Sequence, residues 1–555
     1  MALGRQASLA GTPVLILKDG STRSRGKEAL RGNIAAAKVV ANVVKATLGP
    51  RGMDKMLVDT IGDVTITNDG HEILKEIDVQ HPAAKMIVEV AETQDKEVGD
   101  GTTTAVILAG ELLKNAEEML DKNIHPTTIV SGYRKASEEA LRILRKVAVD
   151  VNLDDRDVLK KAAMTSMRGK LISIAQDHFS DIAIDAVKQI IEKKGDRLTA
   201  DKDDIQTVKK PGKSLLDTQL IKGIIVDKEV TASDMPKRVE KAKILLLDSA
   251  LEIEKTEIDA EIRIRNPLQM KAFLDEETNM LRDMVDKVAK SGANVVLCQK
   301  GIDDMAQHFL GKKGILAVRR IKASDMEKLS KATGARIISN MEGISAKDLG
   351  AANLVEERKI GDDKMVFVEG CKNPKAISIL IRGGLERLVD EAERSLNDAL
   401  CVVIDIVKQN KIVAGGGAIE EQLSRGLREY AAKVGGREQL AIEGFANALE
   451  IIPSTLAENA GLDTIDVLVA LRTAHEKPNG LWMGVNVYKG EVTDMMKEGV
   501  VEPLSVKEQA IKSATEAASM ILRIDDIIAS AKSPPMPPQG GGGMGGMPGG
   551  MPPEY

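Results

Sequence analysis

The sequence predicts a multidomain protein of the α and α/β classes, with a helical block at each end of the chain and an α/β unit between them. Its 555 residues exceed what a single hydrophobic core usually organises. Apolar residues recur with helical spacing near both ends, whereas short β-prone runs alternate with amphipathic helices in the centre. We expect the two distant helical blocks to share one core.

The N-terminal block opens with a helix expected over Lys27 to Leu48, which Gly49-Pro50 ends. Two short β runs, 56–58 and 64–67, follow and are predicted to form a hairpin. Asn68-Asp69-Gly70 after the second run is typical of a turn. The helical stripe that supports the first prediction consists of Leu30, Ile34, Ala37, Ala41, Val44 and Leu48.

The centre of the chain divides into a charged connecting unit over 151–217 and an α/β unit over 218–367. Inside the latter, the charged stretch from Leu251 to Phe273 is predicted to be rich in helix and to project from the body. After Phe367 the chain is strongly helical again, and Ser533 to Tyr555 has the composition of a disordered tail. The strands expected in the α/β unit are 244–247, 295–298, 315–318 and 336–339.

Composition excludes several functional classes. The net charge of -6 has the wrong sign for a surface built to bind nucleic acid. Cysteines are only three, without a CxxC pair, and the six histidines lack metal-ligand spacing. Neither a membrane span nor a signal-peptide pattern at Met1 to Asp19 is evident, so we expect a cytosolic protein.

The sharpest local signal is Gly99-Asp100-Gly101-Thr102-Thr103-Thr104 between two expected helices, 82–98 and about 102–120. Free amides and the helix dipole at such a helix start favour a bound anion, and glycine permits close approach of phosphate. An aspartate beside phosphate can hold Mg²⁺. An ordinary glycine turn with a threonine cap fits the same string.

The other candidate motifs indicate a binding site only when they are considered together. Thr47 to Gly52 is a second glycine turn at a helix end, and Ala414 to Ala418 holds three adjacent glycines between helical stretches. The carboxylates of Asp69 and Asp398 fit the edge of a site, although each also fits a solvated surface position. Gly212-Lys213-Ser214 resembles the end of a P-loop, but Thr207 stands where its first glycine is required, and kinase motifs are absent.

Taken together, these strings resemble the group II chaperonins of the thermosome (TCP-1) type in identity and order. The similarity extends from about Val14 to Ala531. The matching motifs are Leu48 to Lys55, Ile66 to Gly70, Gln80 to Lys85, Gly99 to Thr104, Thr256 to Arg263, Ala414 to Gly417 and Gln509 to Glu516.

The resemblance implies the chaperonin fold, with three domains of which two are discontinuous. A mostly helical equatorial domain would comprise 1–150 and 404–532, and a small α/β intermediate domain 151–217 and 368–403. The apical α/β domain would be 218–367, with a helical protrusion at about 250–275, and 533–555 would be the tail.

The resemblance also assigns roles within an ATP and Mg²⁺ site. Asp100 matches the residue that holds Mg²⁺, and Asp69 and Asp398 match the carboxylates that position and activate the attacking water. Lys170 resembles a lysine that senses the γ-phosphate, and Gly484-Val485-Asn486 resembles part of the adenine and ribose pocket. The residues matching nucleotide contacts are Leu48, Gly49, Pro50, Gly101, Thr102, Thr103, Thr104, Gly415, Gly416 and Asn486.

The implied function is an ATPase that encloses non-native proteins and couples ATP hydrolysis to lid closure and folding. Its partners would be copies of itself or paralogues in a back-to-back double ring, together with unfolded proteins. The protrusion would serve as a built-in lid, without a separate lid protein, although a surface helix pair fits the same residues. Likewise, apolar residues expected on helices of the central unit fit either a surface that captures clients or core packing: Met305, Phe309, Leu310, Met326 and Leu329.

Two departures from the family pattern concern the site. His71-Glu72 follows Asn-Asp-Gly where the family has a small residue and threonine, so a hydroxyl near the water site is expected to be missing. Leu171 follows Lys170 where the family has glycine. Two functions of other classes stay open: a small-molecule phosphotransferase with the same nucleotide site, and a holdase assembly without productive folding.

Overall fold

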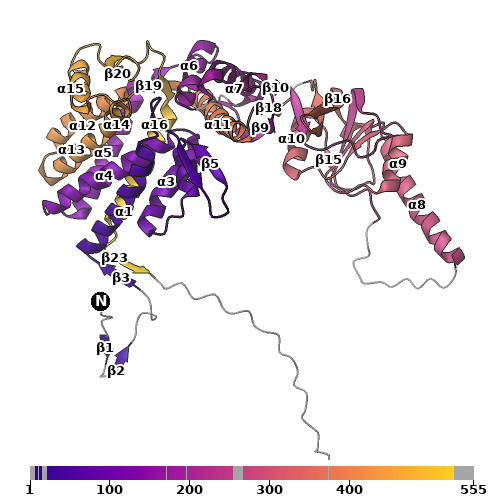
Figure 1. Cartoon of the computed structure of the whole chain (residues 1–555), viewed down its shortest axis with the longest axis horizontal. Coiled ribbons are helices and arrows are strands. Elements are labelled where there is room, and N and C mark those ends of the chain that lie inside the picture. The colour runs from indigo at the N-terminus through magenta and orange to yellow at the C-terminus, as the bar shows by residue number, and fades with distance from the viewer. Residues whose placement is uncertain are drawn as a thin grey trace, which may run out of the picture.

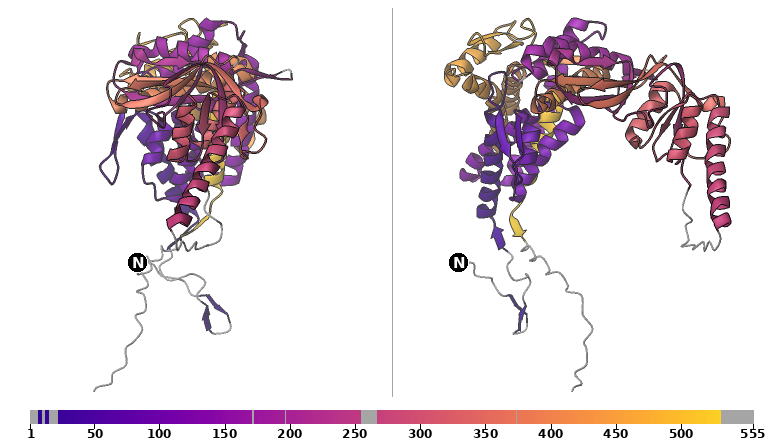
Figure 2. Two further views of the ribbon diagram at one scale, coloured as in Figure 1. Left: turned by 90° about the vertical axis from the view of Figure 1, so that its right-hand side faces the viewer. Right: turned by 45° about the vertical axis from the view of Figure 1, so that its right-hand side comes forward.

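The computed structural model describes Ala7–Leu9, Thr12–Val14 and residues 22–529, apart from residues 171, 196, 254–266 and 373. A helical body lies at one end of the molecule, an α/β unit lies at the other, and a smaller unit connects them (Figure 1). Strand β3 (Thr22–Arg25) pairs with β23 (Asp526–Ala529), the last described strand, at the foot of the helical body, as Figure 2 also shows. The overall architecture confirms the predicted multidomain α and α/β class.

The helical body is built from both ends of the chain. One hydrophobic cluster contains Ile34 of the first helix, Leu108 of α4 and Ile511 of α16, so the two predicted blocks share one core. Tyr133 meets Phe445 edge to face within it, at 5.7 Å between ring centroids. The helices are α1 Lys27–Lys45, α2 Gly70–Glu76, α3 Pro82–Val98, α4 Thr102–Asp121, α5 Pro126–Val147, α12 Ala418–Val434, α13 Gly436–Leu449, α14 Ile451–Asn459, α15 Thr464–His475 and α16 Leu504–Leu522.

The helical body also contains several small sheets. The predicted hairpin forms from β4 (Lys55–Val58) and β5 (Val64–Thr67), which pair antiparallel. The remaining strands are β1 Ala7–Leu9 with β2 Thr12–Val14, β3 Thr22–Arg25 with β23 Asp526–Ala529, β20 Met483–Asn486 with β21 Glu491–Asp494, and the sheet β22 (Val501–Pro503), β19 (Lys411–Ala414), β6 (Val149–Asp150). Strand β19 leads directly into the Gly415–Gly417 turn.

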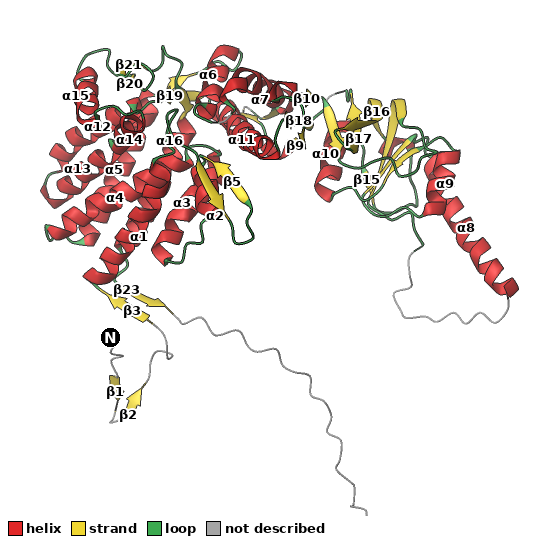
Figure 3. Ribbon diagram, viewed as in Figure 1, coloured by secondary structure: helices red, strands yellow, loops and turns green. Residues whose placement is uncertain are grey.

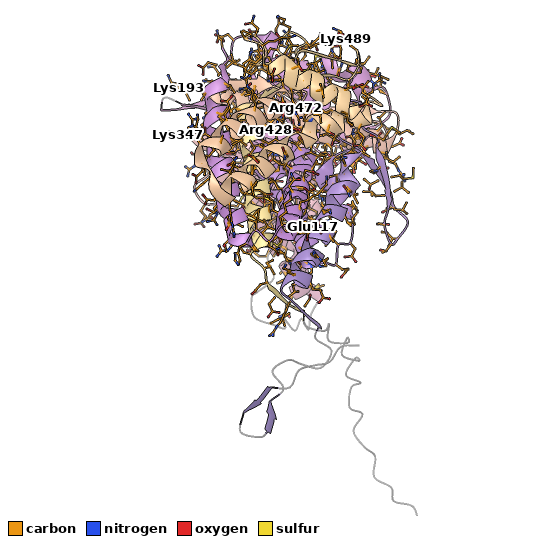
Figure 4. The ribbon with its side chains drawn as sticks, turned by 90° about the vertical axis from the view of Figure 1, so that its left-hand side faces the viewer. Glu117, Lys193, Lys347, Arg428, Arg472 and Lys489 are labelled. Atoms are coloured by element: carbon orange, nitrogen blue, oxygen red, sulfur yellow. The ribbon has the colours of Figure 1, made fainter. Side chains whose placement is uncertain are left out.

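An ion cluster around a buried carboxylate ties the later helices together. Arg428 of α12 and Arg472 of α15, labelled near each other in Figure 4, both pair with the carboxylate of Glu450 between α13 and α14. Because Glu450 is almost fully buried, two cations are needed to offset the cost of removing its charge from water. The cluster fixes α12, whose N-terminus follows the triple-glycine turn.

The connecting unit packs helices on a three-stranded sheet. Helix α11 (Glu386–Gln409) packs against α6 (Arg156–Met167) and α7 (Gln176–Ile190). The sheet has the order β10 (Gln219–Ile221), β18 (Ile377–Gly383), β9 (Ile205–Pro211), and a hairpin of β7 (Glu192–Lys194) and β8 (Arg197–Thr199) lies beside it. Single 3-10 turns occur at Ser173–Ala175, Lys202–Asp204, Leu215–Asp217 and, further on, Ala346–Asp348.

The α/β unit is a mixed seven-stranded sheet, coloured yellow at the far end of Figure 3. Its strand order is β11 (Gly223–Val226), β17 (Asp363–Glu369), β16 (Gly350–Ile360), β12 (Arg238–Leu247), β13 (Val295–Cys298), β14 (Leu316–Val318), with β15 (Ile337–Ile338) beside β12. Its helices are α8 Pro267–Lys290, α9 Asp304–Lys312 and α10 Ala323–Thr333. All four predicted strand positions coincide with strands of this sheet.

Several details differ from the sequence prediction. Of the stretch Leu251–Phe273, the described residues from Pro267 onward are helical and belong to α8, which continues to Lys290, while Leu251 forms a β-bridge with Ile302. The rest of the predicted protrusion, 254–266, lies outside the described residues, as do residue 171 and the predicted tail. Of the five apolar residues expected either on a client surface or in the core, Leu310, Met326 and Leu329 are fully buried and belong to the core. Phe309 is partly buried against that core, and Met305 is 43% exposed.

The hydrophobic clusters divide the chain close to the expected domain borders. Val368 and Cys371 pack with the seven-stranded sheet, beyond the expected border at Phe367, and β10 belongs to the three-stranded sheet. The three-domain division with its exact limits therefore remains a proposal. No helix in the described part of the chain is long and apolar enough to span a membrane.

Candidate active site

The loop between α3 and α4 presents a helix N-terminus with free amides. Gly99 ends α3 and Gly101 precedes α4, and both adopt left-handed backbone with φ of 67° and 75°. Glycine is favoured at both positions because side chains rarely tolerate this conformation. No side chain caps α4 at Gly101, so the amides of its first turn, Thr102 to Thr104, are available to an anion.

Asp69 lies next to this turn and is held by three hydrogen bonds. It caps α2, where its carboxylate accepts from the backbone amides of His71 at 3.2 Å and Glu72 at 3.3 Å. The hydroxyl of Thr102 donates to the same carboxylate at 2.9 Å. The predicted turn at Asn68-Asp69-Gly70 is thus wrong in part, because Asp69 starts a helix there. Thr102 supplies a hydroxyl beside Asp69, whereas positions 71 and 72 are His and Glu, so the expectation of a missing hydroxyl near the water site stays a prediction.

Two further carboxylates and one lysine complete a buried charged group. Asp398 of α11 is ion-paired with Lys170, and each side chain is only 12% exposed. Burial raises the pKa of Asp398 well above its usual range, and Asp69 and Asp100 add to the rise, although Lys170 opposes it. Burial likewise raises the pKa of Asp100, whose carboxylate accepts from the Gly101 amide at 2.7 Å.

Lys170 keeps its charge in this setting. Burial by itself lowers the pKa of Lys170, but the carboxylates of Asp398, Asp69 and Asp100 outweigh it, and the net pKa is raised. Three acids therefore face one base, and burial disfavours the charged forms of Asp100 and Asp398. A divalent cation beside them would favour those charged forms.

A cavity of about 470 Å³ opens beside this charged group. Gly49 has φ of 81°, and a Cβ there would overlap Leu456 Cδ2, so only glycine fits. Gly416 has φ of 64°, and a Cβ there would lie 2.6 Å from Met495 Sδ. Of the residues singled out from the sequence, those that line the cavity are Leu48, Gly49, Pro50, Thr104, Gly416 and Asn486.

The remaining predicted contact residues do not line the cavity: Asp100, Gly101, Thr102, Thr103 and Gly415. A Cβ on Gly415 would lie 2.5 Å from Glu502 Oε1, so this glycine packs directly on a buried carboxylate. Thr103 packs against Gly70, where a Cβ would lie 2.6 Å from its hydroxyl. Asn486 lines the cavity, but its side-chain oxygen accepts from the amides of Tyr488 and Lys489 at 3.2 Å each.

Lys170 is brought to the site by a contact between segments far apart in sequence. A Cβ on Gly169 would lie 2.8 Å from Pro50 Cα, so this glycine lies directly against the Gly49-Pro50 turn. The side-chain amide of Asn68 donates to the Gly169 carbonyl at 3.2 Å. The end of α6 is thereby fixed against the helical body, with Lys170 facing Asp398.

Two residues of the cavity wall were missed from the sequence. Lys507 of α16 pairs with Glu420 at 2.8 Å and Glu502 at 2.7 Å, and all three side chains are largely buried. Burial lowers the pKa of Lys507, but the two carboxylates outweigh it, and the net pKa is raised. Glu502 and Lys507 look like surface charges in the sequence, and no motif distinguishes them.

The acidic residues offer a partial coordination shell for a metal. Among the residues that the structure describes, no group of three or more His, Cys, Asp or Glu side chains forms a ready-made cage. Mg²⁺ seldom uses such a cage, since it prefers one or two carboxylates together with phosphate oxygens and water. The buried Asp100 carboxylate next to the free amides of α4 fits that requirement.

Comparison with known proteins identifies the family of the chain. The model of the TCP-1/cpn60 chaperonin family matches residues 40–532. The chain is 60% identical over 522 residues to a thermosome subunit beta of Sulfurisphaera tokodaii, covering 94% of this chain and 95% of that protein. It is 59% identical over 542 residues to a thermosome subunit beta of Archaeoglobus fulgidus, covering 98% and 99%, and 59% identical over 524 residues to the alpha subunit of the same organism, covering 94% and 96%. The chain therefore belongs to the TCP-1/cpn60 chaperonin family.

Proposed function

We propose that this group II chaperonin subunit, an ATP-dependent chaperone, binds and hydrolyses ATP in the 470 Å³ cavity and the charged group beside it. The observation that carries the proposal is the convergence of Asp69, Asp100 and Asp398 with Lys170, which come from four distant segments. They meet at an uncapped helix N-terminus. Phosphoryl transfer to water needs this kind of fixed positioning and charge compensation.

The triphosphate would lie between two glycine turns. On one side are the amides of Thr102, Thr103 and Thr104 at the start of α4, and on the other side are Leu48, Gly49 and Pro50. Gly416 would present its backbone to the nucleotide from the cavity wall, next to Gly415, which packs on Glu502. Lys507 adds a buried positive charge. Asn486 would contribute through its backbone and its place on the wall, since its side chain already closes a turn.

Asp100 would hold Mg²⁺, which neutralises phosphate charge when it is bound. Asp398 and Asp69 would orient the attacking water and accept its proton. Burial raises the pKa of Asp398, which makes its carboxylate a stronger base. Because Lys170 is already paired with Asp398, an incoming γ-phosphate would compete for this lysine and free the carboxylate to bind water.

Hydrolysis would be coupled to a change of shape because the site spans two units of the fold. Asp398 and Lys170 belong to the connecting unit, whereas Asp69 and Asp100 belong to the helical body. Closure of one on the other would complete the site. We infer that copies of this chain, alone or with paralogues, form a back-to-back double ring in the cytosol. The ring would enclose unfolded proteins under its own protrusions.

Replacing Asp398 by alanine tests this assignment. We expect Asp398→Ala rings to bind ATP with an affinity within about threefold of wild type, because the phosphate contacts remain. Turnover should fall at least about 100-fold, the usual loss when a general base is removed. Glu386→Gln, which removes an exposed charge from the same helix, should leave both unchanged. Calorimetry with MgATP and phosphate release measure the two quantities, and wild-type turnover by Asp398→Ala would rule out the role of Asp398.

A further inference from the structure

Three side chains on one face of α11 follow the edge of the candidate site. Asp398, Cys401 and Asp405 are spaced three and four residues apart, so they point to the same side of the helix. Asp398 pairs with Lys170, and Cys401 packs on Gly99, where a Cβ would lie 2.5 Å from its own. Asp405 accepts a hydrogen bond from the hydroxyl of Ser505 at 2.6 Å. This face therefore extends from the loop of Asp100 to the first turn of α16.

The first turn of α16 holds the Asp100 loop as well. The side-chain amide of Gln94 donates to the carbonyl of Val506 at 3.1 Å and to that of Asp100 at 2.9 Å. Val506 also packs on Gly101, where a Cβ would lie 2.7 Å from Val506 Cγ1. Neighbouring residues of one turn thus contact both the loop of Asp100 and the helix of Asp398.

Asp405 is an unusual group for stability alone. It is 5% exposed, and within the described ranges it takes part in no ion pair, so a serine hydroxyl is its direct polar partner. Lys408 favours its charge and Asp100 opposes it, both through space. Burying a carboxylate costs several kcal/mol unless a cation compensates it closely. An apolar residue at this position would pack at lower cost.

We propose that Asp405 is a positioning residue whose hydrogen bond to Ser505 fixes α11 on α16 and so sets the place of Asp398 relative to Asp100. Asp405 lies seven residues from Asp398, about 10 Å along a continuous helix, so a tilt at one reaches the other. Misplacement of a catalytic group by about 1 Å can cost 100-fold in rate. The inference rests on the role proposed above for Asp398.

Two substitutions separate positioning from folding. Ser505→Ala removes the donor with almost no change in volume. Asp405→Asn keeps an acceptor oxygen for Ser505 and removes the buried charge. We expect Ser505→Ala rings to lose about 10-fold in kcat, with KM and MgATP affinity within twofold of wild type. Asp405→Asn should retain at least half of wild-type kcat at neutral pH, and the control Glu386→Gln should be unchanged.

The measurements are kcat and KM from phosphate release, MgATP affinity by calorimetry, and ring assembly by electron microscopy. Wild-type kcat in Ser505→Ala overturns the proposal. So does a loss of kcat that accompanies an equal loss of affinity or of assembled rings, or an Asp405→Asn variant as slow as Ser505→Ala. Asp398→Ala is measured alongside: if it is active, the assignment of Asp398 fails, whereas an inactive Asp398→Ala with a fully active Ser505→Ala refutes only the role of Asp405.

Discussion

Replacing Gly99 by alanine should misalign Asp100 and Asp398 through a steric clash. Gly99 has φ of 67°, which costs an alanine roughly 1–2 kcal/mol. The new Cβ would lie 2.5 Å from Cys401 Cβ, whereas carbon atoms rest at about 3.5–4.0 Å. The loop and α11 must therefore separate by about 1 Å, at a further cost of about 1–3 kcal/mol for overpacking.

The consequence for turnover follows from the same distance. Because Cys401 lies one turn after Asp398, a 1 Å separation displaces Asp398 from the Asp100 loop, and we expect kcat to fall about 100-fold. Gly62→Ala is the matched control, since Gly62 also has positive φ, of 92°, but no atom lies within 4 Å of its would-be Cβ. It should lose stability by the conformational cost alone and keep its turnover.

The assay is steady-state phosphate release by assembled rings of Gly99→Ala, Gly62→Ala and the double variant Gly99→Ala/Cys401→Ala. The double variant removes the Cys401 sulfur, which the new Cβ would overlap, but keeps the Cys401 Cβ at 2.5 Å, so it should recover only part of the lost rate. If Gly99→Ala turns over as fast as Gly62→Ala, then the contact between α11 and the Asp100 loop does not control the position of Asp398.

Two other predictions concern Thr102 and Asp405. Thr102→Val removes the hydroxyl that donates to Asp69 at 2.9 Å. Because hydrogen bonds to charged groups contribute about 1.5–3 kcal/mol, kcat should fall about 10-fold or more. If phosphate release shows a change in KM alone, this prediction is contradicted. Burial raises the pKa of Asp405 to about 6, against 3.8 ordinarily. The folded state thus holds this proton more tightly, and the resulting stability is present below about pH 4 and is lost as pH rises through 6. The buried charge of Asp405 lowers the free energy of unfolding by about 3 kcal/mol above pH 7, and the Asp405→Asn variant avoids this loss. The melting temperature of the variant relative to wild type should therefore rise from pH 4.5 to 7.5. Parallel curves of melting temperature against pH for the two proteins would refute this prediction.

Local sequence patterns predicted the helices and strands well because burial periodicity and glycine stops act over a few residues. The helix expected at Pro82 to Val98 has those limits, and the next begins at Thr102 as expected. The pattern failed at Asn68-Asp69-Gly70, since the residue types that make a turn also cap a helix. Asp69 begins α2, and only the following helical residues distinguish the two cases.

The site was harder to predict than its parts. No spacing rule brings Asp69, Asp100 and Asp398 together, because their meeting depends on how α11 packs across the body. Their grouping came from resemblance to a family. Lys507 and Asp405 were missed because a charged residue is normally at the surface, and only the folded chain buries them.

The shared core of the two chain ends has a consequence for biosynthesis. Gln94 and its partner Val506 are 412 residues apart, and α4 packs against α16, which leaves the ribosome roughly 400 residues after α4. At a synthesis rate of about 5–20 residues per second, the apolar faces of the first helices stay uncovered for roughly 20–80 s before α16 is synthesised. During that time the nascent subunit exposes apolar surface and is itself an incompletely folded polypeptide of the kind that its assembled form would enclose.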